Sequence, residues 1–193
     1  MKRKAVDDID GRKKKKNKLT RPVEKYSGAG ILFYRRDEKS KVQFLLGKAN
    51  KPDEKKEETK LDLSHDKLVF IGGKREDIDG GFPVVTAVRE CREELKEVVK
   101  IGVSELERSP RFRYNESGYI IFLHKLPMKF NVVKKFSKMR YGSKEISSLH
   151  WVDYDVLVMD KPSDQPPIST FVRKVITSIG YEELASASGH KLD

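Results

Sequence analysis

Four glutamates at helical spacing are the residues of this sequence best suited to chemistry. They lie in segment 83–99, which Pro83 can open because a first helical turn does not need the missing N–H. At about 100° per residue, Glu90, Glu93, Glu94 and Glu97 fall within an arc of roughly 100°. An apolar stripe lies beside this arc, so the acids border whatever surface the helix packs on.

These crowded carboxylates predict a bound cation. Glu90–Glu94 and Glu93–Glu97 are like-charge i,i+4 pairs, and each costs an isolated helix roughly 0.2–0.5 kcal/mol. Hard oxygen ligands on a rigid helix suit Mg²⁺ or Mn²⁺, which share their remaining coordination positions with phosphates. The alternative is an ordinary solvated acidic face. Gly72 and Gly73 favour a ligand site, because two glycines after a short apolar strand permit close approach to the backbone.

Apolar runs and turn residues indicate the elements that position this helix. We expect strands at 28–34, 42–46, 68–71, 112–114, 119–124 and 148–152, helices at 83–99 and 167–179, and an exposed loop over 49–66. The order strands, helix, strands, helix predicts a mixed α/β sandwich. We expect a disordered basic arm at 1–25, one folded domain at 26–182 and a flexible C-terminal tail at 183–193.

With its glycine lead-in, the acidic helix resembles that of the Nudix hydrolases. Residues 89–94 (Arg-Glu-Cys-Arg-Glu-Glu) match the six-residue centre of the family pattern, and Gly72-Gly73-Lys74 match the usual lead-in. Glu145, an acid before a strand that carries Trp151, resembles the family's later segment. The resemblance covers residues 26–180 and implies an α/β/α sandwich around a mixed sheet.

Two departures from the family pattern bear on the acidic helix and its outlying acid. Asp79 stands where the family has a glutamate, and nine residues rather than seven separate it from Arg89. Either Asp79 or Glu76 could therefore serve as the outlying acid. Lys96 and Glu97 replace the Gly–apolar pair that ends the pattern, so we expect the helix to continue past them.

The resemblance implies roles for single residues. Glu90, Glu93 and Glu94 would hold divalent ions, the Gly73 carbonyl could join them, and Arg89 would orient the acidic cluster. The metal would activate a water for attack on phosphorus. Glu90, Glu94 and Glu145 are the candidate general bases. The candidate substrate contacts are Lys74, Arg111 and Arg113, and an ordinary basic strand is the alternative for the two arginines.

Positive charge points to a nucleic-acid substrate. The net charge is +11, and residues 1–25 carry eleven Lys or Arg against four Asp or Glu, in two clusters that resemble a nuclear localisation signal. Further along, cations interleave with Phe130, Phe136 and Tyr141, which are the ingredients of a single-strand groove. These cations are Lys134, Lys135, Lys138 and Arg140. The alternative is a solvated segment whose aromatic side chains belong to the core.

With such a groove the chain resembles the mRNA-decapping members of the family, and this resemblance implies release of a capped nucleoside diphosphate. Small substrates remain alternatives, namely dinucleoside polyphosphates, nucleotide sugars, nucleoside triphosphates and diphosphoinositol phosphates. A catalytically silent RNA-binding Nudix module is another, although it would not need the intact acid set. The single cysteine and the lack of a long apolar run indicate an intracellular protein, nuclear or cytoplasmic, without a membrane segment. The sequence does not predict the oligomeric state.

Overall fold

A single mixed sheet organises the chain. The computed structural model describes residues 25–50, 66–96, 98–139, 145–159 and 164–189. The expected arm, except Lys25, and most of the loop 49–66 lie outside these residues. The strands are β1 (Gly28–Arg36), β2 (Val42–Ala49), β3 (Leu68–Val69), β4 (Ile71–Lys74), β5 (Arg111–Tyr114), β6 (Tyr119–Lys125) and β7 (Ile146–Asp153).

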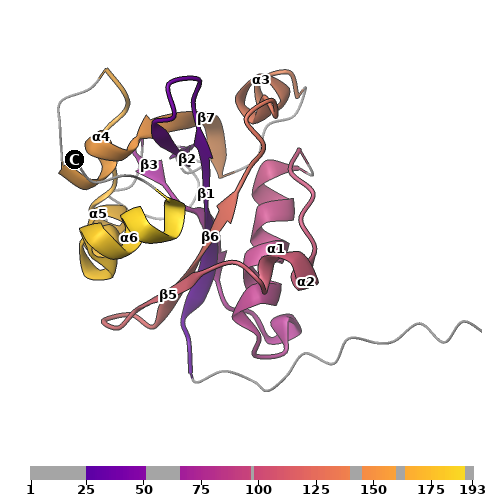
Figure 1. Ribbon diagram of the computed structural model, residues 1–193. Helices are drawn as coiled ribbons and strands as arrows, with labels where there is room; N and C mark the ends of the chain where they lie inside the picture. The colour runs from indigo at the N-terminus through magenta and orange to yellow at the C-terminus, as the bar shows by residue number, and fades with distance from the viewer. Residues whose placement is uncertain (1–24, 51–65, 97, 140–144, 160–163, 190–193) are drawn as a thin grey trace, which may run out of the picture.

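Strand β1 is the centre of this sheet (Figure 1). It pairs in parallel with β6 on one edge, while its other edge pairs with β4 over residues 28–31 and with β2 over residues 33–36. Strand β2 also pairs with β3 and β7, and β5 forms an antiparallel hairpin with β6. The mixture of parallel and antiparallel pairs confirms the predicted sheet type.

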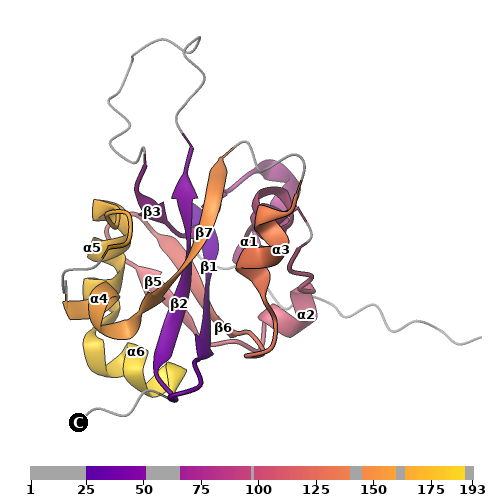
Figure 2. The same ribbon diagram turned by 90° about the horizontal axis from the view of Figure 1, so that it is seen from above.

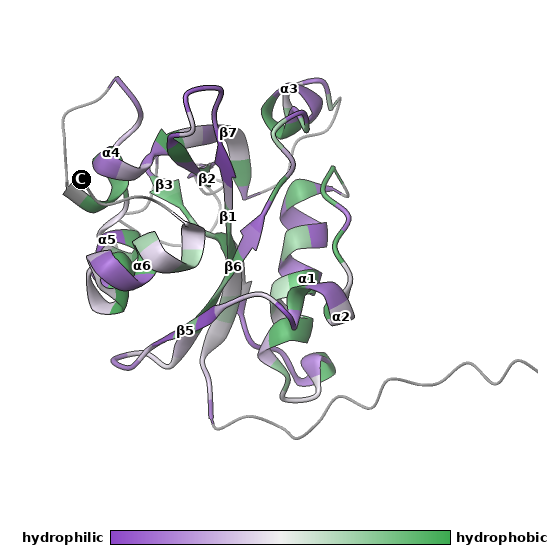
Figure 3. Cartoon of the chain, in the orientation of Figure 1, coloured by the Kyte–Doolittle hydropathy of each residue, from purple (hydrophilic) through white to green (hydrophobic). Residues whose placement is uncertain are grey.

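Helices cover both faces of the sheet, as Figure 2 shows from above. One face carries α1 (Pro83–Leu95), α2 (Val103–Leu106) and α3 (Val132–Ser137). The other carries α4 (Tyr154–Met159), α5 (Thr170–Ile179) and α6 (Tyr181–Ser188). A short 3-10 helix, η1 (Asp77–Asp79), precedes α1. The α/β/α sandwich is therefore confirmed. In Figure 3, hydrophobic and hydrophilic residues alternate along α1, as expected for a helix with one face on the core.

The long helix ends four residues earlier than predicted. Helix α1 stops at Leu95, and its cap residue Lys96 adopts the left-handed conformation with φ of 47° and ψ of 41°. Left-handed backbone normally ends helices at glycine, and here a lysine adopts it. Glu97 lies outside the described residues, so the Glu93–Glu97 pair is not described.

Other boundaries also differ from those predicted. The C-terminal tail was expected to be flexible from residue 183, but α6 continues to Ser188 and buries Leu184 and Ala185 completely. Segment 68–71 is divided into β3 and β4, which pair with different strands. The helix predicted over 167–179 begins at Thr170 rather than at Pro167, with Ser169 as its hydrogen-bonded cap. No helix of the described part is long and apolar enough to cross a bilayer.

Candidate active site

Three of the predicted carboxylates converge at one point. Glu90 and Glu94 lie one turn apart on α1, and Glu145 immediately precedes β7. One ligand oxygen from each lies within 4.8 Å of the others. Glu90 and Glu94 are buried, with 7% and 4% of their surfaces exposed, whereas Glu145 is exposed. Residues more than fifty positions apart in the sequence thus form one negatively charged group.

Glu94 is held by the glycine lead-in. Its Oε2 accepts a hydrogen bond of 2.7 Å from the backbone N–H of Gly72. Burial raises the pKa of Glu94 well above its ordinary value, and the negative charges of Glu90 and Glu145 raise it further, against the opposing effect of the Gly72 bond. A buried carboxylate in this position is unfavourable unless a cation accompanies it.

Glu90 packs against the second glycine. A Cβ atom on Gly73 would lie 2.6 Å from Oε2 of Glu90, so only glycine leaves room for this carboxylate. Burial raises the pKa of Glu90, while Arg89, whose Nη1 lies 2.9 Å from its Oε1, lowers it. The position of Gly73 beside the carboxylate is consistent with the predicted backbone ligand, which remains a prediction.

Arg89 is the centre of a buried network that anchors the loop before α1. Its Nε donates to Oδ1 of Asp79 at 2.9 Å, and its Nη2 donates to the carbonyl of Lys74 at 2.9 Å. Asp79, only 1% exposed, also accepts from the hydroxyl of Thr86 and the backbone N–H of Glu76. Burial would raise the pKa of Asp79, but these donors together hold it below its ordinary value.

This network distinguishes the two candidates for the outlying acid. Asp79 is the buried partner of Arg89, whereas Glu76 is exposed and lies 3.5 Å from Nη1 of Arg89. The two-residue insertion is accommodated between η1 and α1, where Gly80 and Gly81 both have positive φ. Asp79 thus fixes the arginine that in turn contacts Glu90, and the orienting role of Arg89 stays a prediction.

Glu93 lies beside this network rather than inside the carboxylate group. Its side chain is 59% exposed, and its Oε2 lies 3.3 Å from Nη1 of Arg89. Cation binding by Glu93 therefore stays a prediction. The side chain of Lys74 is exposed at the end of β4, next to the site, where its own carbonyl is bound by Arg89.

Arg111 and Arg113 lie on β5, the edge strand, and both are exposed. Nη2 of Arg113 donates to the carbonyl of Lys25 at 3.0 Å, so this arginine anchors the chain that leads into β1. Among the contacts described for the structure, neither arginine reaches the carboxylate group. Their role in substrate binding remains a prediction.

The basic segment after β6 differs from the expected groove. Phe136 is buried in the core on the α1 face, and Phe130 is partly buried against the same core. Nζ of Lys135 lies 4.3 Å from the centroid of the Phe130 ring. The ring of Phe136 therefore cannot stack on a base, which corrects that part of the groove interpretation, whereas the ring of Phe130 is only partly buried. Lys134, Lys135 and Lys138 are exposed around α3. Arg140 and Tyr141 lie outside the described residues.

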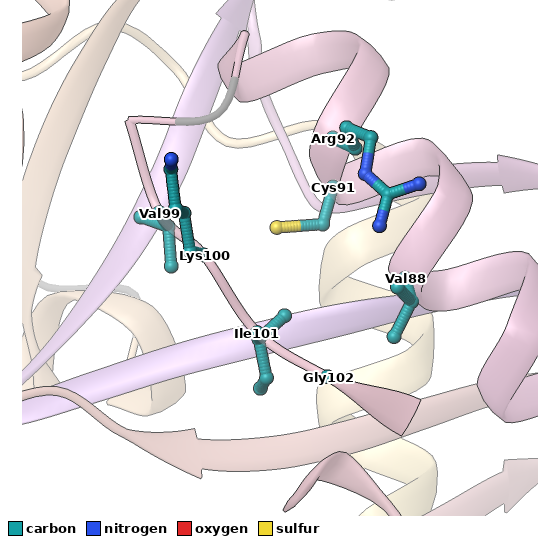
Figure 4. Close-up of a pocket in the computed structure, with 7 residues that line it drawn as sticks. All are labelled: Val88, Cys91, Arg92, Val99, Lys100, Ile101 and Gly102. Carbon is teal, nitrogen blue, oxygen red and sulfur yellow. The ribbon is translucent and has the colours of Figure 1, made fainter. Parts of the chain in front are cut away.

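A cavity of about 360 Å³ also borders α1, and Figure 4 shows Val88, Cys91 and Arg92 on one wall, facing residues 99–102. None of its lining residues belongs to the carboxylate group. Cys91 is 1% exposed, and burial raises its pKa to about 12, so the thiol stays protonated at neutral pH. The buried thiol thus packs in the core on the α1 face of the sheet.

Two contacts of the site had no signal in the sequence. The hydroxyls of Tyr26 and Thr86 lie 2.8 Å apart, which connects the start of the domain to the Asp79 network. Tyr119, the first residue of β6, packs against the glycine lead-in from the other face of the sheet. Both contacts join residues distant in sequence: the first depends on the packing of α1 beside the start of β1, and the second on the pairing of β1 with β4 and β6.

No protein-family model and no curated protein sequence matches the chain. Solved structures that resemble it include a Nudix hydrolase from M. smegmatis, RenU, at 12% identity and TM-score 0.45, over 83% of this chain and 86% of the other. A MutT protein from Methanosarcina mazei has 16% identity and TM-score 0.42, over 83% and 97%. The T. brucei MERS1–RNA complex has 11% identity and TM-score 0.45, over 80% and 64%. Similarity this low does not decide the chemistry.

Proposed function

We propose that this chain is a Nudix hydrolase that uses Mg²⁺ or Mn²⁺ to cleave a phosphoanhydride bond in a nucleoside-diphosphate-linked substrate. The observation that carries the proposal is the convergence of Glu90, Glu94 and Glu145 within 4.8 Å, with two of them buried. Such a group repels itself and loses solvation, and a divalent cation relieves both costs. The match of residues 89–94 to the family pattern supports the same chemistry.

The residues divide into cation ligands and residues that hold the ligands in place. Glu90, Glu94 and Glu145 offer oxygens to the cation, with Glu93 and the Gly73 carbonyl as further candidates. A bound Mg²⁺ or Mn²⁺ would neutralise phosphate charge and lower the pKa of a bound water. Arg89 and Asp79 fix the side chain of Glu90, and the Gly72 N–H fixes that of Glu94.

Glu145 is our candidate for the general base. Glu145 is the exposed member of the group, so water reaches it most readily. Glu90 and Glu94 remain the alternatives. Lys74, which is exposed at the end of β4, is our candidate for contact with a substrate phosphate.

RNA with a 5′ cap is the substrate that we propose. Three exposed cations lie on α3 or at its C-terminal cap, namely Lys134, Lys135 and Lys138, and only residues 138–144 separate the helix from Glu145. A phosphate backbone leaving the cleavage site could follow this face. The small substrates and a silent binding module are the competing possibilities.

A substrate panel tests the hydrolase proposal. Purified protein with Mg²⁺ or Mn²⁺ would receive capped RNA, free cap, dinucleoside polyphosphates, nucleotide sugars, nucleoside triphosphates and diphosphoinositol phosphates. We expect metal-dependent hydrolysis that Glu94→Gln reduces about 100-fold or more, because several kcal/mol of charge stabilisation is lost. Glu107→Gln, an exposed acid at the end of α2, is the matched control and should retain wild-type rates. Equal rates for both variants would exclude this site.

A second comparison tests RNA contact by α3. The triple variant Lys134→Gln, Lys135→Gln, Lys138→Gln removes three charges, and Lys39→Gln, Lys41→Gln, Lys174→Gln removes three exposed charges elsewhere. We expect only the first to weaken binding of single-stranded RNA, with a slope of log K against log salt that is shallower by about 2. Equal slopes for the two triple variants would contradict a role for α3.

A further inference from the structure

Tyr119 packs against glycines of β1 and β4, on the sheet face opposite the carboxylate group. A Cβ atom on Gly28 would come within 2.9 Å of its ring, and one on Gly30 within 2.8 Å of its hydroxyl oxygen. A Cβ on Gly72 would come within 2.6 Å of the same oxygen. Three glycines from two paired strands, β1 and β4, thus make room for one phenol.

Gly72 links this phenol to the cation site. Its N–H donates to Oε2 of Glu94 at 2.7 Å, while its Cα faces the hydroxyl of Tyr119. Tyr119 packs in the core on the α5 face, and Glu94 belongs to α1 on the opposite face. The peptide that holds the carboxylate is therefore supported from behind by the phenol. Burial raises the pKa of Tyr119, and the charges of Glu94 and Glu90 raise it further, so the phenol is neutral.

Helix α5 holds the phenol against the glycines. The ring of Phe171 meets that of Tyr119 edge-to-face, with centroids 5.2 Å apart. Phe171 also contacts Tyr114 at 6.0 Å, in the same T-shaped arrangement. Tyr114 thus shares the aromatic cluster but makes no described contact with the glycines, and its hydroxyl instead bonds to Glu116.

We propose that Tyr119 is a positioning residue for the cation site, acting through Gly72. The phenol keeps the Gly72 peptide in the orientation that presents its N–H to Glu94. Without the phenol, the Gly72 peptide gains room toward the α5 face, and Glu94 loses its fixed orientation. This inference rests on the proposed function, because it assumes that Glu94 binds a divalent cation.

Binding of Mn²⁺ alone, measured by titration calorimetry on the full chain, tests the inference. We expect Tyr119→Leu to weaken Mn²⁺ binding by about tenfold or more, in the range typical of residues that support metal ligands. Tyr119→Phe should lie between this variant and the wild type, since its ring still covers Gly28 but the atom against Gly72 is gone. Tyr114→Leu is the matched control, because it removes a tyrosine of the same cluster and should bind Mn²⁺ like the wild type.

A second readout separates positioning from general destabilisation. At low Mn²⁺, hydrolysis by Tyr119→Leu should be slow, and saturating Mn²⁺ should restore kcat close to that of the wild type. Wild-type affinity in Tyr119→Leu would overturn the inference, and so would equal weakening in Tyr114→Leu. If Tyr119→Leu does not fold, Tyr119→Phe decides, since unchanged affinity overturns the inference and weakened affinity supports it. Failure of the wild type itself to bind Mn²⁺ would overturn the proposed function instead.

Discussion

Replacing Glu94 by Gln should make the metal-free protein more stable while removing its activity. The substitution deletes one negative charge from the group of three, and glutamine retains an oxygen that can accept from the Gly72 N–H. The folded protein holds the Glu94 proton to a higher pH than the unfolded chain does, because the pKa of Glu94 is raised. The free energy of unfolding therefore falls as pH rises above the ordinary value of 4.5, and the full penalty is present above the raised pKa.

Two calculations give the size of the stabilisation. Two unit charges 4.8 Å apart repel by about 3 kcal/mol at an effective dielectric constant of about 20. Independently, a raised pKa costs at most about 1.4 kcal/mol for each pH unit above the ordinary value, which limits the cost at pH 7 to about 3 kcal/mol. Solvent around the exposed Glu145 weakens part of the repulsion. We therefore expect Glu94→Gln to raise the free energy of unfolding by about 1–3 kcal/mol at pH 7.

Urea unfolding in EDTA measures the stability of the metal-free protein, and urea unfolding with excess Mg²⁺ measures the stability that the cation adds. The wild type should gain stability from Mg²⁺, because the cation binds the folded state alone, whereas Glu94→Gln should gain little. Glu107→Gln, which changes the charge equally on an exposed surface, should behave like the wild type in both conditions. A variant less stable than the wild type in EDTA, with the same gain from Mg²⁺, would refute the reasoning.

Three further substitutions give separate tests. Asp79→Asn removes the more deeply buried of the two carboxylates that lie 2.9 Å from Arg89 and should lower the free energy of unfolding by about 2 kcal/mol in urea titrations; no loss would mean that Glu90 alone satisfies the arginine. Lys96→Gly removes the backbone strain of a lysine in the left-handed conformation. It should raise the free energy of unfolding by about 1 kcal/mol and so raise the melting temperature; a lower melting temperature would contradict the cap geometry. Gly73→Ala places a Cβ 2.6 Å from Oε2 of Glu90 and should lower kcat about tenfold to a hundredfold while circular dichroism stays unchanged; wild-type kcat would show that Glu90 tolerates displacement.

Local spacing predicted the parts of the site that lie within one element. The positions of Glu90 and Glu94 follow from the period of α1, and those of Gly72 and Gly73 follow from the end of a short strand. Only the family resemblance implied that Glu145 belongs with this group. Local spacing could not predict it, because the register of β7 on β2 brings Glu145 there. Composition alone carries no information about such registers.

The parts that could not be predicted depend on tertiary packing. The choice between Asp79 and Glu76 needed the loop geometry, since both precede α1 at comparable distances and only Asp79 turns inward. Helix α6 was missed because its sequence is rich in small and polar residues, yet Leu184 reaches the core. The end of α1 at Lys96 was missed because no glycine marks it.

The pairing of β1 has a consequence for hydrogen exchange at the site. Both edges of β1 are bonded through most of its length, to β6 on one side and to β4 and then β2 on the other. Amides of such a strand exchange only when much of the domain opens, whereas the edge strand β5 and the terminal α6 can open locally. Because β4 bonds directly to β1 and the Gly72 N–H is held by Glu94, the peptides around Gly73 should exchange more slowly than those of β5 and α6. The cation would then meet backbone that is already ordered, and binding should leave protection there almost unchanged while increasing it around Glu145.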